Sequence, residues 1–200
     1  MQLTKNLAYL LGALRDGSVS KFKDNTGKFH HSITFYSKSI EWLKVIQQKI
    51  REVFGIQTKI SSYSGKTPYV RIYSKPIAEI LQKEFQHPLK SQITWVTPTI
   101  IKNNQNKRIL VHYIAGFWDA EGGVDLQNKQ IKFHLSWNED RCLPLEDIKN
   151  VLKKIGIKTG RVCKYENNRG NFPRFVLRVS KKSNNKFLKI IPIQNQNKKN

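Results

Sequence analysis

The sequence repeats itself at about half its length, and this internal duplication limits the possible folds more than any other feature of the chain. Three features recur in the same order in both halves: an apolar helix that ends in an acid and Gly, an amphipathic helix that ends in Gly, and a strand-to-helix junction with Ser-Lys. They occupy residues 7–17 and 112–123, 53–59 and 154–160, and 73–76 and 179–182. Chance explains one such match far more easily than three, so we predict two homologous halves.

The segments between these features show two hydrophobic periods. Residues 131–137 alternate between apolar and polar side chains, as expected for a strand with one buried face, and the same period occurs in 29–36, 69–73 and 174–179. Helical periodicity covers 39–54 and 145–155. Each half is therefore predicted to run helix, hairpin, helix, hairpin, helix, which gives an α+β fold of two αββαββα units.

The predicted boundaries follow from the repeat. Residues 1–85 form the first half and 106–193 the second. Residues 86–105 form a linker with a short helix, which we expect to begin at Thr97-Pro98. Residues 194–200 form a polar tail that we expect to fray.

Charge and composition exclude several classes of protein. The formal net charge is +22, from 36 Lys and Arg against 14 Asp and Glu, and both halves are basic. Such an excess predicts a polyanionic partner, with nucleic acid as the default. Two Cys are too few for a disulfide scaffold, and no apolar run approaches the length of a membrane span or has the order of a signal peptide. We therefore expect an intracellular protein that is neither secreted nor membrane-bound.

The polar faces of the predicted strands indicate how nucleic acid is bound. An antiparallel sheet that packs one face on helices leaves the other face open, and a β-ribbon fits the major groove of duplex DNA. The open face combines long donors, hydroxyls and aromatic rings without an acid. The predicted DNA-binding residues are His30, Ser32, Thr34, Tyr36, Tyr69, Arg71, Tyr73, Lys132, His134, Ser136, Arg174 and Arg178.

The segment Ile114–Gly122 (Ile-Ala-Gly-Phe-Trp-Asp-Ala-Glu-Gly) resembles the signature of the LAGLIDADG homing endonucleases. Its small residues allow two helices to pack closely, and its acid Glu121 stands where Gly ends the helix. The first copy is similar, but Gly12 precedes Asp16 by four residues, whereas Gly116 precedes Glu121 by five. Arg15 also stands where the family usually has a small residue.

The resemblance implies a single-chain, two-motif member with a pseudo-twofold axis, similar to archaeal members encoded in ribosomal RNA introns. In that family the two motif helices pack at the centre, and two antiparallel sheets form a saddle over double-stranded DNA. The resemblance therefore implies a monomer located in the cytoplasm or nucleoid of a prokaryote, and specifically of an archaeon.

The resemblance also implies an activity. Asp16 and Glu121 would hold Mg²⁺, with backbone carbonyls of Arg15 or Gly17 and of Ala120 or Gly122 as further ligands. Each acid would serve one strand across the minor groove, and the break would leave short 3′ overhangs. An acid at a helix C-terminus opposes the helix dipole, which is itself consistent with a cation ligand.

Other residues are assigned to the site by the same resemblance. Lys75 and its repeat mate Lys181 resemble the family's strand-to-helix lysine and are predicted catalytic residues, with Lys182 as the neighbouring alternative. Ser37 or Lys38, and Asn138, occupy the region where the family often has a polar residue that orders water. Asp119 is assigned to helix packing or capping.

A noncatalytic nucleic-acid binder on the same fold is the alternative function, either an RNA splicing maturase, with RNA as a partner, or a DNA-binding regulator. A pure binder has no need for an acid at the end of both motif helices. Because both acids are present, the endonuclease is favoured.

Overall fold

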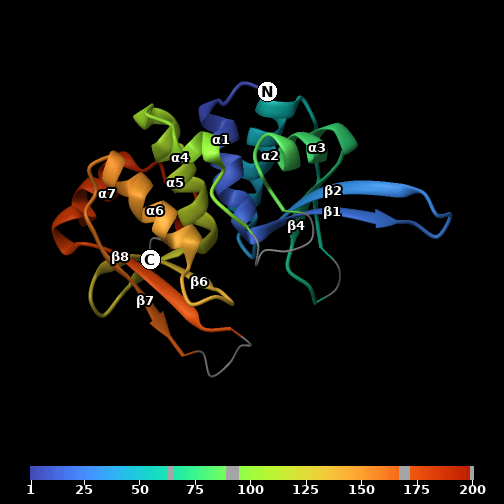
Figure 1. Cartoon of the computed structure of the whole chain (residues 1–200). Helices are drawn as coiled ribbons and strands as arrows, with labels where there is room; N and C mark the ends of the chain where they lie inside the picture. Colours follow the sequence, from blue (N-terminus) through green and yellow to red (C-terminus); the bar gives the residue numbers. More distant parts are fainter. Residues whose placement is uncertain (63–64, 89–94, 167–171, 199–200) are drawn as a thin grey trace.

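The computed structural model describes residues 1–62, 65–88, 95–166 and 172–198, and it consists of two halves with the same order of elements (Figure 1). The first half comprises α1 (Lys5–Ala13), the 3₁₀ turn η1 (Leu14–Asp16), β1 (Gly17–Lys23), β2 (Phe29–Tyr36), α2 (Ile40–Phe54), β3 (Ile60–Ser61), β4 (Tyr69–Tyr73) and α3 (Lys75–Lys83). The second comprises α5 (Lys107–Glu121), β5 (Gly122–Asp125), β6 (Gln130–Ser136), α6 (Leu143–Lys154), β7 (Thr159–Tyr165), β8 (Arg174–Val179), η3 (Lys181–Ser183), α7 (Asn184–Ile190) and η4 (Gln196–Lys198). Helix α4 (Thr99–Lys102) lies between them.

Each half contains a four-stranded antiparallel sheet, ordered β1-β2-β4-β3 in the first and β5-β6-β8-β7 in the second. In the first sheet Ile33 is paired with Val19 on one side and with Ile72 on the other, and all three side chains are buried. Phe133 and Leu177 form the equivalent buried pair in the second sheet. The α+β class and the αββαββα order are thus confirmed. The period-2 pattern holds in β6, whereas Ser32–Phe35 of β2 and Phe175–Leu177 of β8 are buried at consecutive positions.

Helices α1 and α5 pack against each other between the two sheets (Figure 1). A Cβ added to Gly12 would lie 2.2 Å from the carbonyl oxygen of Tyr113, and one added to Gly116 would lie 2.0 Å from that of Tyr9. Contacts this short leave no room for a side chain at either position. The two glycines let the helix backbones touch, and the predicted central two-helix interface is confirmed.

Local sequence explains where several helices begin and end. Ser39 caps α2 through its hydroxyl, which accepts the Trp42 amide, and α2 ends at Gly55 in the left-handed conformation (φ +69°). Helix α4 begins at Thr99 with Pro98 at its cap, one residue later than the sequence predicts. Pro98 has an extended ψ of 137°, so the chain turns helical only after it.

The linker and the tail are less open than their composition predicts. Residues 89–94 of the predicted linker lie outside the described residues, but Trp95 is buried against Phe117 of α5, with ring centroids 5.6 Å apart. Gln194 and Asn195 are hydrogen-bonded to the buried side chain of Asp119, so this part of the tail does not fray. No helix in the described part of the chain is long and apolar enough to cross a bilayer.

Candidate active site

The two motif acids lie at equivalent points of the two halves. Asp16 ends η1 and Glu121 ends α5, and each is followed at once by the Gly that begins the first strand of its sheet. Burial raises the pKa of Asp16 to about 6. Burial raises the pKa of Glu121 to about 7, and the negative charge of Asp16 adds to that increase. The structure therefore brings the two predicted carboxylates into one poorly solvated place.

The 3₁₀ turn η1 compensates for the residue missing from the first motif. A 3₁₀ turn rises about 2.0 Å per residue and an α-helix about 1.5 Å, so four residues from Gly12 to Asp16 advance about 7.5 Å, as do five α-helical residues from Gly116 to Glu121. Asp16 is therefore about as far along the helix axis from Gly12 as Glu121 is from Gly116, although the first motif is one residue shorter.

Arg15, at the position where the family usually has a small residue, places a positive charge close to Asp16 and Glu121. Its side chain is buried, and its guanidinium lies 5.6 Å from the centre of the Trp95 ring. Burial lowers the pKa of Arg15, whereas Glu121, followed by Cys142 and Asp16, favours its charged form. Arg15 also lowers the pKa of Glu121, so it offsets part of the repulsion between the carboxylates.

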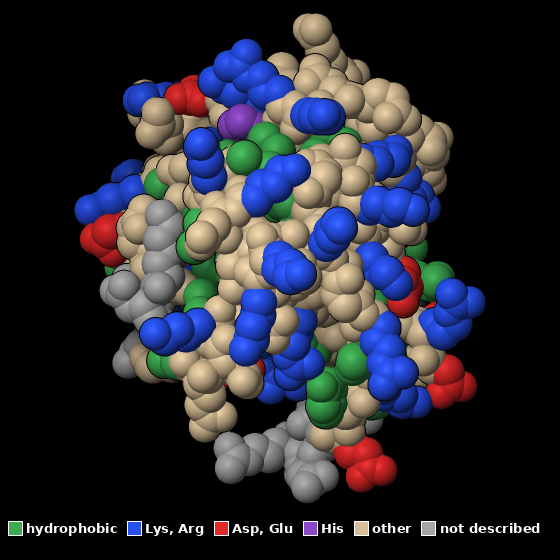
Figure 2. Space-filling view, turned by 90° about the vertical axis from the view of Figure 1, so that its left-hand side faces the viewer, with side chains coloured by type: hydrophobic (Ala, Val, Ile, Leu, Met, Phe, Trp, Pro, Cys, Tyr) green, Lys and Arg blue, Asp and Glu red, His purple; other side chains and the backbone are tan. Residues whose placement is uncertain are grey.

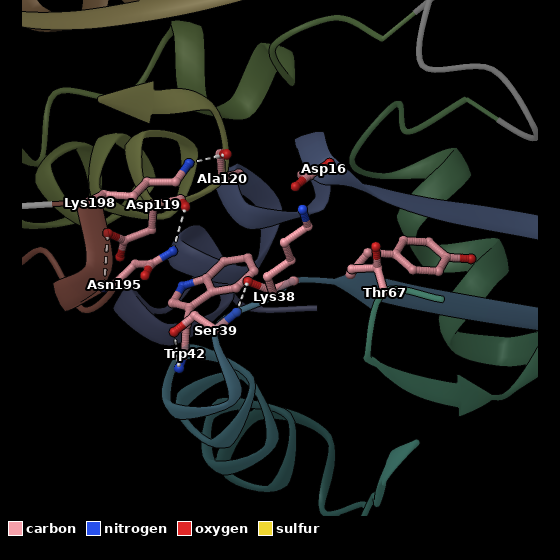
Figure 3. A pocket seen from close by; sticks show the side chains of 11 residues that line it. Asp16, Lys38, Ser39, Trp42, Thr67, Asp119, Ala120, Asn195 and Lys198 are labelled. Atoms are coloured by element: carbon pink, nitrogen blue, oxygen red, sulfur yellow. Dashed lines mark hydrogen bonds between the residues drawn. The ribbon is translucent and has the colours of Figure 1, made fainter. Parts of the chain in front are cut away.

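A cavity of about 410 Å³ opens beside Asp16, and both halves contribute to its wall. The first half supplies the segment from Tyr36 to Ser39, and the second supplies Ala120, Asn195 and Lys198. In Figure 3 the Lys38 side chain extends toward Asp16, and the Lys198 side chain extends toward the Ala120 carbonyl. Of the polar residues predicted to order water, Ser37 and Lys38 therefore border the cavity.

Lys198 is the site residue that the sequence did not reveal. Its Nζ donates a hydrogen bond to the carbonyl oxygen of Ala120. Burial lowers the pKa of Lys198, while Glu121, Asp16 and Asp119 favour its charged form. A lysine near the end of a polar, basic tail carries no sequence signal that distinguishes it from its neighbours.

The donor set around the acids suits a hard cation that keeps much of its water. Among the described residues no three His, Cys, Asp or Glu side chains come together as a ready-made metal site. The available ligands are the Asp16 and Glu121 carboxylates and the Ala120 carbonyl, which already accepts the Lys198 ammonium. A small number of oxygen ligands suits Mg²⁺, because this ion usually keeps several water molecules in its coordination shell. Gly17, the other predicted ligand, is buried directly after Asp16.

The structure does not bring the predicted catalytic lysines to these acids. Lys75 lies on α3, 3.9 Å from Glu79, with 69% of its side chain exposed. Lys181 and Lys182 are exposed on η3. None of the three borders the cavity beside Asp16, and Asn138 does not border it either.

The predicted DNA-binding residues of the first half share one sheet face, but not all are accessible. Ser32, Thr34 and Tyr36 are paired with Tyr73, Arg71 and Tyr69, respectively. Arg71 lies over the Tyr69 ring at 4.7 Å, and its Nε donates to Thr34 Oγ1 at 2.9 Å. Ser32 and Thr34 are only 3% and 1% exposed, whereas Tyr73 is 63% exposed. Ser32 and Thr34, both predicted DNA contacts, are therefore buried, and Arg71 is hydrogen-bonded to the Thr34 hydroxyl.

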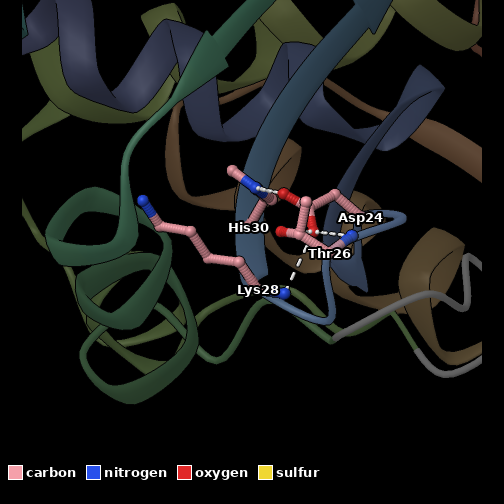
Figure 4. Close-up of polar contacts among 4 residues, drawn as sticks. All are labelled: Asp24, Thr26, Lys28 and His30. Atoms are coloured by element: carbon pink, nitrogen blue, oxygen red, sulfur yellow. Dashed lines mark hydrogen bonds and ion pairs between the residues drawn. The ribbon is translucent and has the colours of Figure 1, made fainter.

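His30 is engaged with the β1–β2 turn (Figure 4). Its Nε2 lies 2.7 Å from Asp24 Oδ2, while Asp24 Oδ1 accepts hydrogen bonds from the backbone amides of Thr26 and Lys28. The hydroxyl of Thr26 and His30 lower the pKa of Asp24 below its usual range. The contact with Asp24 thus fixes the position of the His30 side chain relative to the turn.

The second sheet presents an equivalent face. Lys132, His134 and Ser136 alternate with buried residues on β6, and Lys132 and Ser136 are paired with Arg178 and Arg174 of β8. His134 is half-buried; burial, then the charge of Arg174, lowers its pKa to about 4. Arg178 donates to the hydroxyl of Tyr165 of β7 at 2.8 Å, so Tyr165, which the sequence did not single out, borders the same face.

Comparisons with known proteins agree with this geometry. Residues 109–192 match the family model described as a LAGLIDADG-like domain. The homing endonuclease I-ApeI of Aeropyrum pernix is 33% identical over 156 residues, which cover 76% of this chain and 67% of that protein. The uncharacterised protein MJ0314 of Methanocaldococcus jannaschii is 26% identical over 172 residues, covering 82% of this chain and 59% of its own length.

Solved structures show the same fold. I-DmoI in complex with DNA and Mn superposes with a TM-score of 0.67 at 23% identity, over 95% of this chain and 97% of that one. The homing endonuclease I-WcaI bound to its DNA recognition sequence superposes with a TM-score of 0.57 at 16% identity, over 96% and 82% of the two chains. At these identities the likeness establishes the architecture and not the activity.

Proposed function

The chain belongs to the LAGLIDADG homing endonuclease family, and from that membership we propose that it is a site-specific endonuclease that hydrolyses both strands of a duplex DNA target. The observation that carries the proposal is the pair of partly buried carboxylates, Asp16 and Glu121, at the joint between two sheets with basic outer faces. A protein that only binds DNA gains nothing from two acids with raised pKa values at this joint. We propose that each acid serves one strand, across the minor groove, and that the products carry short 3′ overhangs.

In the proposed site, Asp16, Glu121 and the carbonyl of Ala120 would hold divalent metal, with Gly17 as a further candidate. A bound divalent cation supplies an activated water and stabilises charge on the leaving oxygen. Mg²⁺ is the proposed ion, and the I-DmoI relative has been solved with Mn, with Mg and with Ca. Arg15 keeps the two carboxylates close at a tolerable electrostatic cost.

The proposed positive groups that face the DNA phosphate are Lys198 and Lys38. Both border the cavity beside Asp16 and extend into it (Figure 3), where an ammonium group would stabilise charge that develops on the phosphate. Lys75 and Lys181 have the weaker case, because neither borders this cavity.

The outer faces of the two sheets are the proposed DNA-reading surface. Arg71, Tyr73, Arg174, Arg178 and Lys132 offer donors and aromatic rings there. Positive charge also extends beyond the sheets, since Figure 2 shows Lys and Arg side chains spread over the flank formed by the second half, with few acids among them. Affinity should therefore be largely electrostatic and fall steeply with salt.

Cleavage of a random-sequence duplex library with Mg²⁺, followed by sequencing of the ends, tests the proposal. The wild type should cut a recurring site, and Asp16→Asn and Glu121→Gln should bind that site about as well yet make no double-strand break. Lys198→Met should slow cleavage about 100-fold or more, the usual cost of losing one group that stabilises transition-state charge, whereas the exposed-lysine control Lys182→Met should cut at the wild-type rate. Binding without any cutting, with Mg²⁺ or Mn²⁺, would overturn the proposal in favour of a noncatalytic binder.

A further inference from the structure

Asp119 makes more hydrogen bonds than helix packing requires. It lies on α5, two residues before Glu121, and its side chain is 1% exposed. Its Oδ2 accepts from the Tyr9 hydroxyl at 2.5 Å and from the Gln194 amide at 2.9 Å, and its Oδ1 accepts from the Asn195 amide at 3.1 Å. The Asn195 side-chain amide donates in turn to the Asp119 carbonyl at 3.2 Å. Asp119 therefore holds the start of the C-terminal tail through both of its oxygens.

The described part of the tail, residues 194–198, contains no apolar side chain that could pack into the core. Ile191 and Ile193 are buried, but every residue from Gln194 onward is polar. Burial raises the pKa of Asp119, whereas its hydrogen bonds from Tyr9, Gln194 and Asn195 favour the ionised form. Hydrogen bonds to an ionised carboxylate are about twice as strong as neutral ones. The turn η4 begins directly after Asn195 and ends at Lys198, whose ammonium reaches the Ala120 carbonyl. The position of Lys198 thus depends on the two amides that Asp119 holds.

The same bond network continues to the opposite wall of the cavity. The Trp42 indole Nε1 donates to the Tyr9 hydroxyl at 2.7 Å, so Trp42, Tyr9 and Asp119 form one buried chain. The Trp42 amide donates to Ser39 Oγ, and Ser39 directly follows Lys38. Figure 3 shows Trp42 and Asp119, the two outer members of this hydrogen-bonded series. Lys38 lies on the Trp42 side of the cavity, and Lys198 lies on the Asp119 side.

We infer that Asp119 is a positioning residue, which ties the C-terminal tail to both motif helices and so fixes Lys198 against the carboxylate pair. The inference rests on the proposed endonuclease function, because it assigns Lys198 a place in that reaction. Asp119 touches neither DNA nor metal in this scheme; it acts only through the tail. Its first-half partner, Tyr9, makes the placement of Lys198 depend on the packing of the two halves.

A double-mutant cycle tests this role. Asp119→Asn keeps the size of the side chain but cannot accept from both tail amides and from Tyr9. We expect its single-turnover cleavage rate with Mg²⁺ to fall about 10- to 100-fold, as is typical when a supporting residue of a catalytic site is removed, while DNA affinity in Ca²⁺ stays within about threefold. In a Lys198→Met background the same substitution should cause no further loss. An additive loss overturns the inference, because it means that Asp119 acts independently of Lys198.

Asp147→Asn is the matched control, since Asp147 is a partly buried acid on α6 that touches the linker at Thr97 and not the tail. It should alter the melting temperature without changing the cleavage rate.

If Asp119→Asn does not fold, Asn195→Ala replaces it, because this variant removes only the bond to the Asp119 carbonyl. Asn195→Ala alone should lower the cleavage rate modestly. In the Lys198→Met background it should cause no further loss of rate, and a further loss there overturns the inference. Failure of the wild type to cut would instead remove the proposed function itself.

Discussion

Gly12 of α1 and Gly116 of α5 place the backbones of the two halves in direct contact, each opposite a carbonyl oxygen of the other helix. No side chain separates the helices at this level, so the separation of their C-terminal ends is set by main-chain atoms. Asp16 and Glu121 follow these glycines by four and five residues. The spacing of the carboxylates is therefore as rigid as the helix pair.

Gly116→Ala should destabilise the protein and impair cleavage more than DNA binding. The added Cβ would lie 2.0 Å from the Tyr9 carbonyl oxygen, and backbone cannot move aside as a flexible side chain can. We expect the free energy of unfolding in urea to fall by about 1–3 kcal/mol, the usual cost of overpacking. Gly160→Ala is the control, since its Cβ would meet only the Arg178 carbonyl at 3.9 Å. Equal stability of the two variants would contradict this account.

Glu121→Gln should stabilise the metal-free protein at pH 8 and have little effect at pH 5. Burial raises the folded-state pKa of Glu121 to about 7, from a reference value of 4.5. The folded protein thus holds a proton that the unfolded chain releases, and this contribution to stability is present below pH 4.5 and lost as the pH rises through 7. At about 1.4 kcal/mol per pKa unit, a rise from 4.5 to about 7 gives an expected gain of about 3 kcal/mol at pH 8. Urea unfolding with a chelator measures it; a Gln variant less stable than wild type at pH 8 would contradict the burial argument.

Arg71→Ala should weaken DNA binding and flatten its salt dependence. Arg71 lies among Thr34, Tyr69 and Tyr73 on the outer face of the first sheet. If it neutralises one phosphate, the slope of log K against log salt should fall by about 1. If it contacts a base instead, one target position should lose specificity at a cost of about 1–3 kcal/mol. Titration at several salt concentrations separates the two, and Arg51→Ala, on the exposed surface of α2, is the charge-matched control.

Asp24→Ala should loosen the β1–β2 turn and leave the second hairpin unchanged. Asp24 accepts the amides of Thr26 and Lys28, and its pKa is held below the usual range by the Thr26 hydroxyl, then by His30 and these two amides. The stabilisation is present above the ordinary carboxyl pKa and lost as the pH falls through the depressed folded-state value. Hydrogen exchange at the Thr26 and Lys28 amides should quicken in the variant. Unchanged exchange at both would refute the role of Asp24, and the Asn128 amide on Asp125 is the internal reference.

The fold was predictable from sequence because its determinants are local and occur twice. Alternation in 131–137 predicted which strand face is buried, and the small residues Gly12 and Gly116 indicated the helix contact. Both acids were found for the same reason, since each stands at the end of a recognisable motif.

The rest of the site depends on contacts between residues far apart in the chain. Lys198 reaches the Ala120 carbonyl from a tail whose Gln194 and Asn195 amides bind Asp119, 75 and 76 residues earlier in the chain. Lys75 and Lys181 were predicted as catalytic residues from their equivalent positions in the two halves. A position at the start of a helix does not determine which way a long, flexible side chain extends. The burial of Ser32 and Thr34 likewise follows from the side chains that cover them, which period 2 cannot reveal.

No loop separates either acid from the sheet that follows it: β1 begins at Gly17 and β5 at Gly122, one residue after Asp16 and Glu121. The group proposed to cut and the surface proposed to read are thus parts of one stiff unit in each half. Exchanging side chains on the outer faces of the sheets should change which bases are recognised without moving the point of cleavage relative to them. The scaffold consequently offers retargeting by surface substitution, with the cut site fixed by backbone geometry.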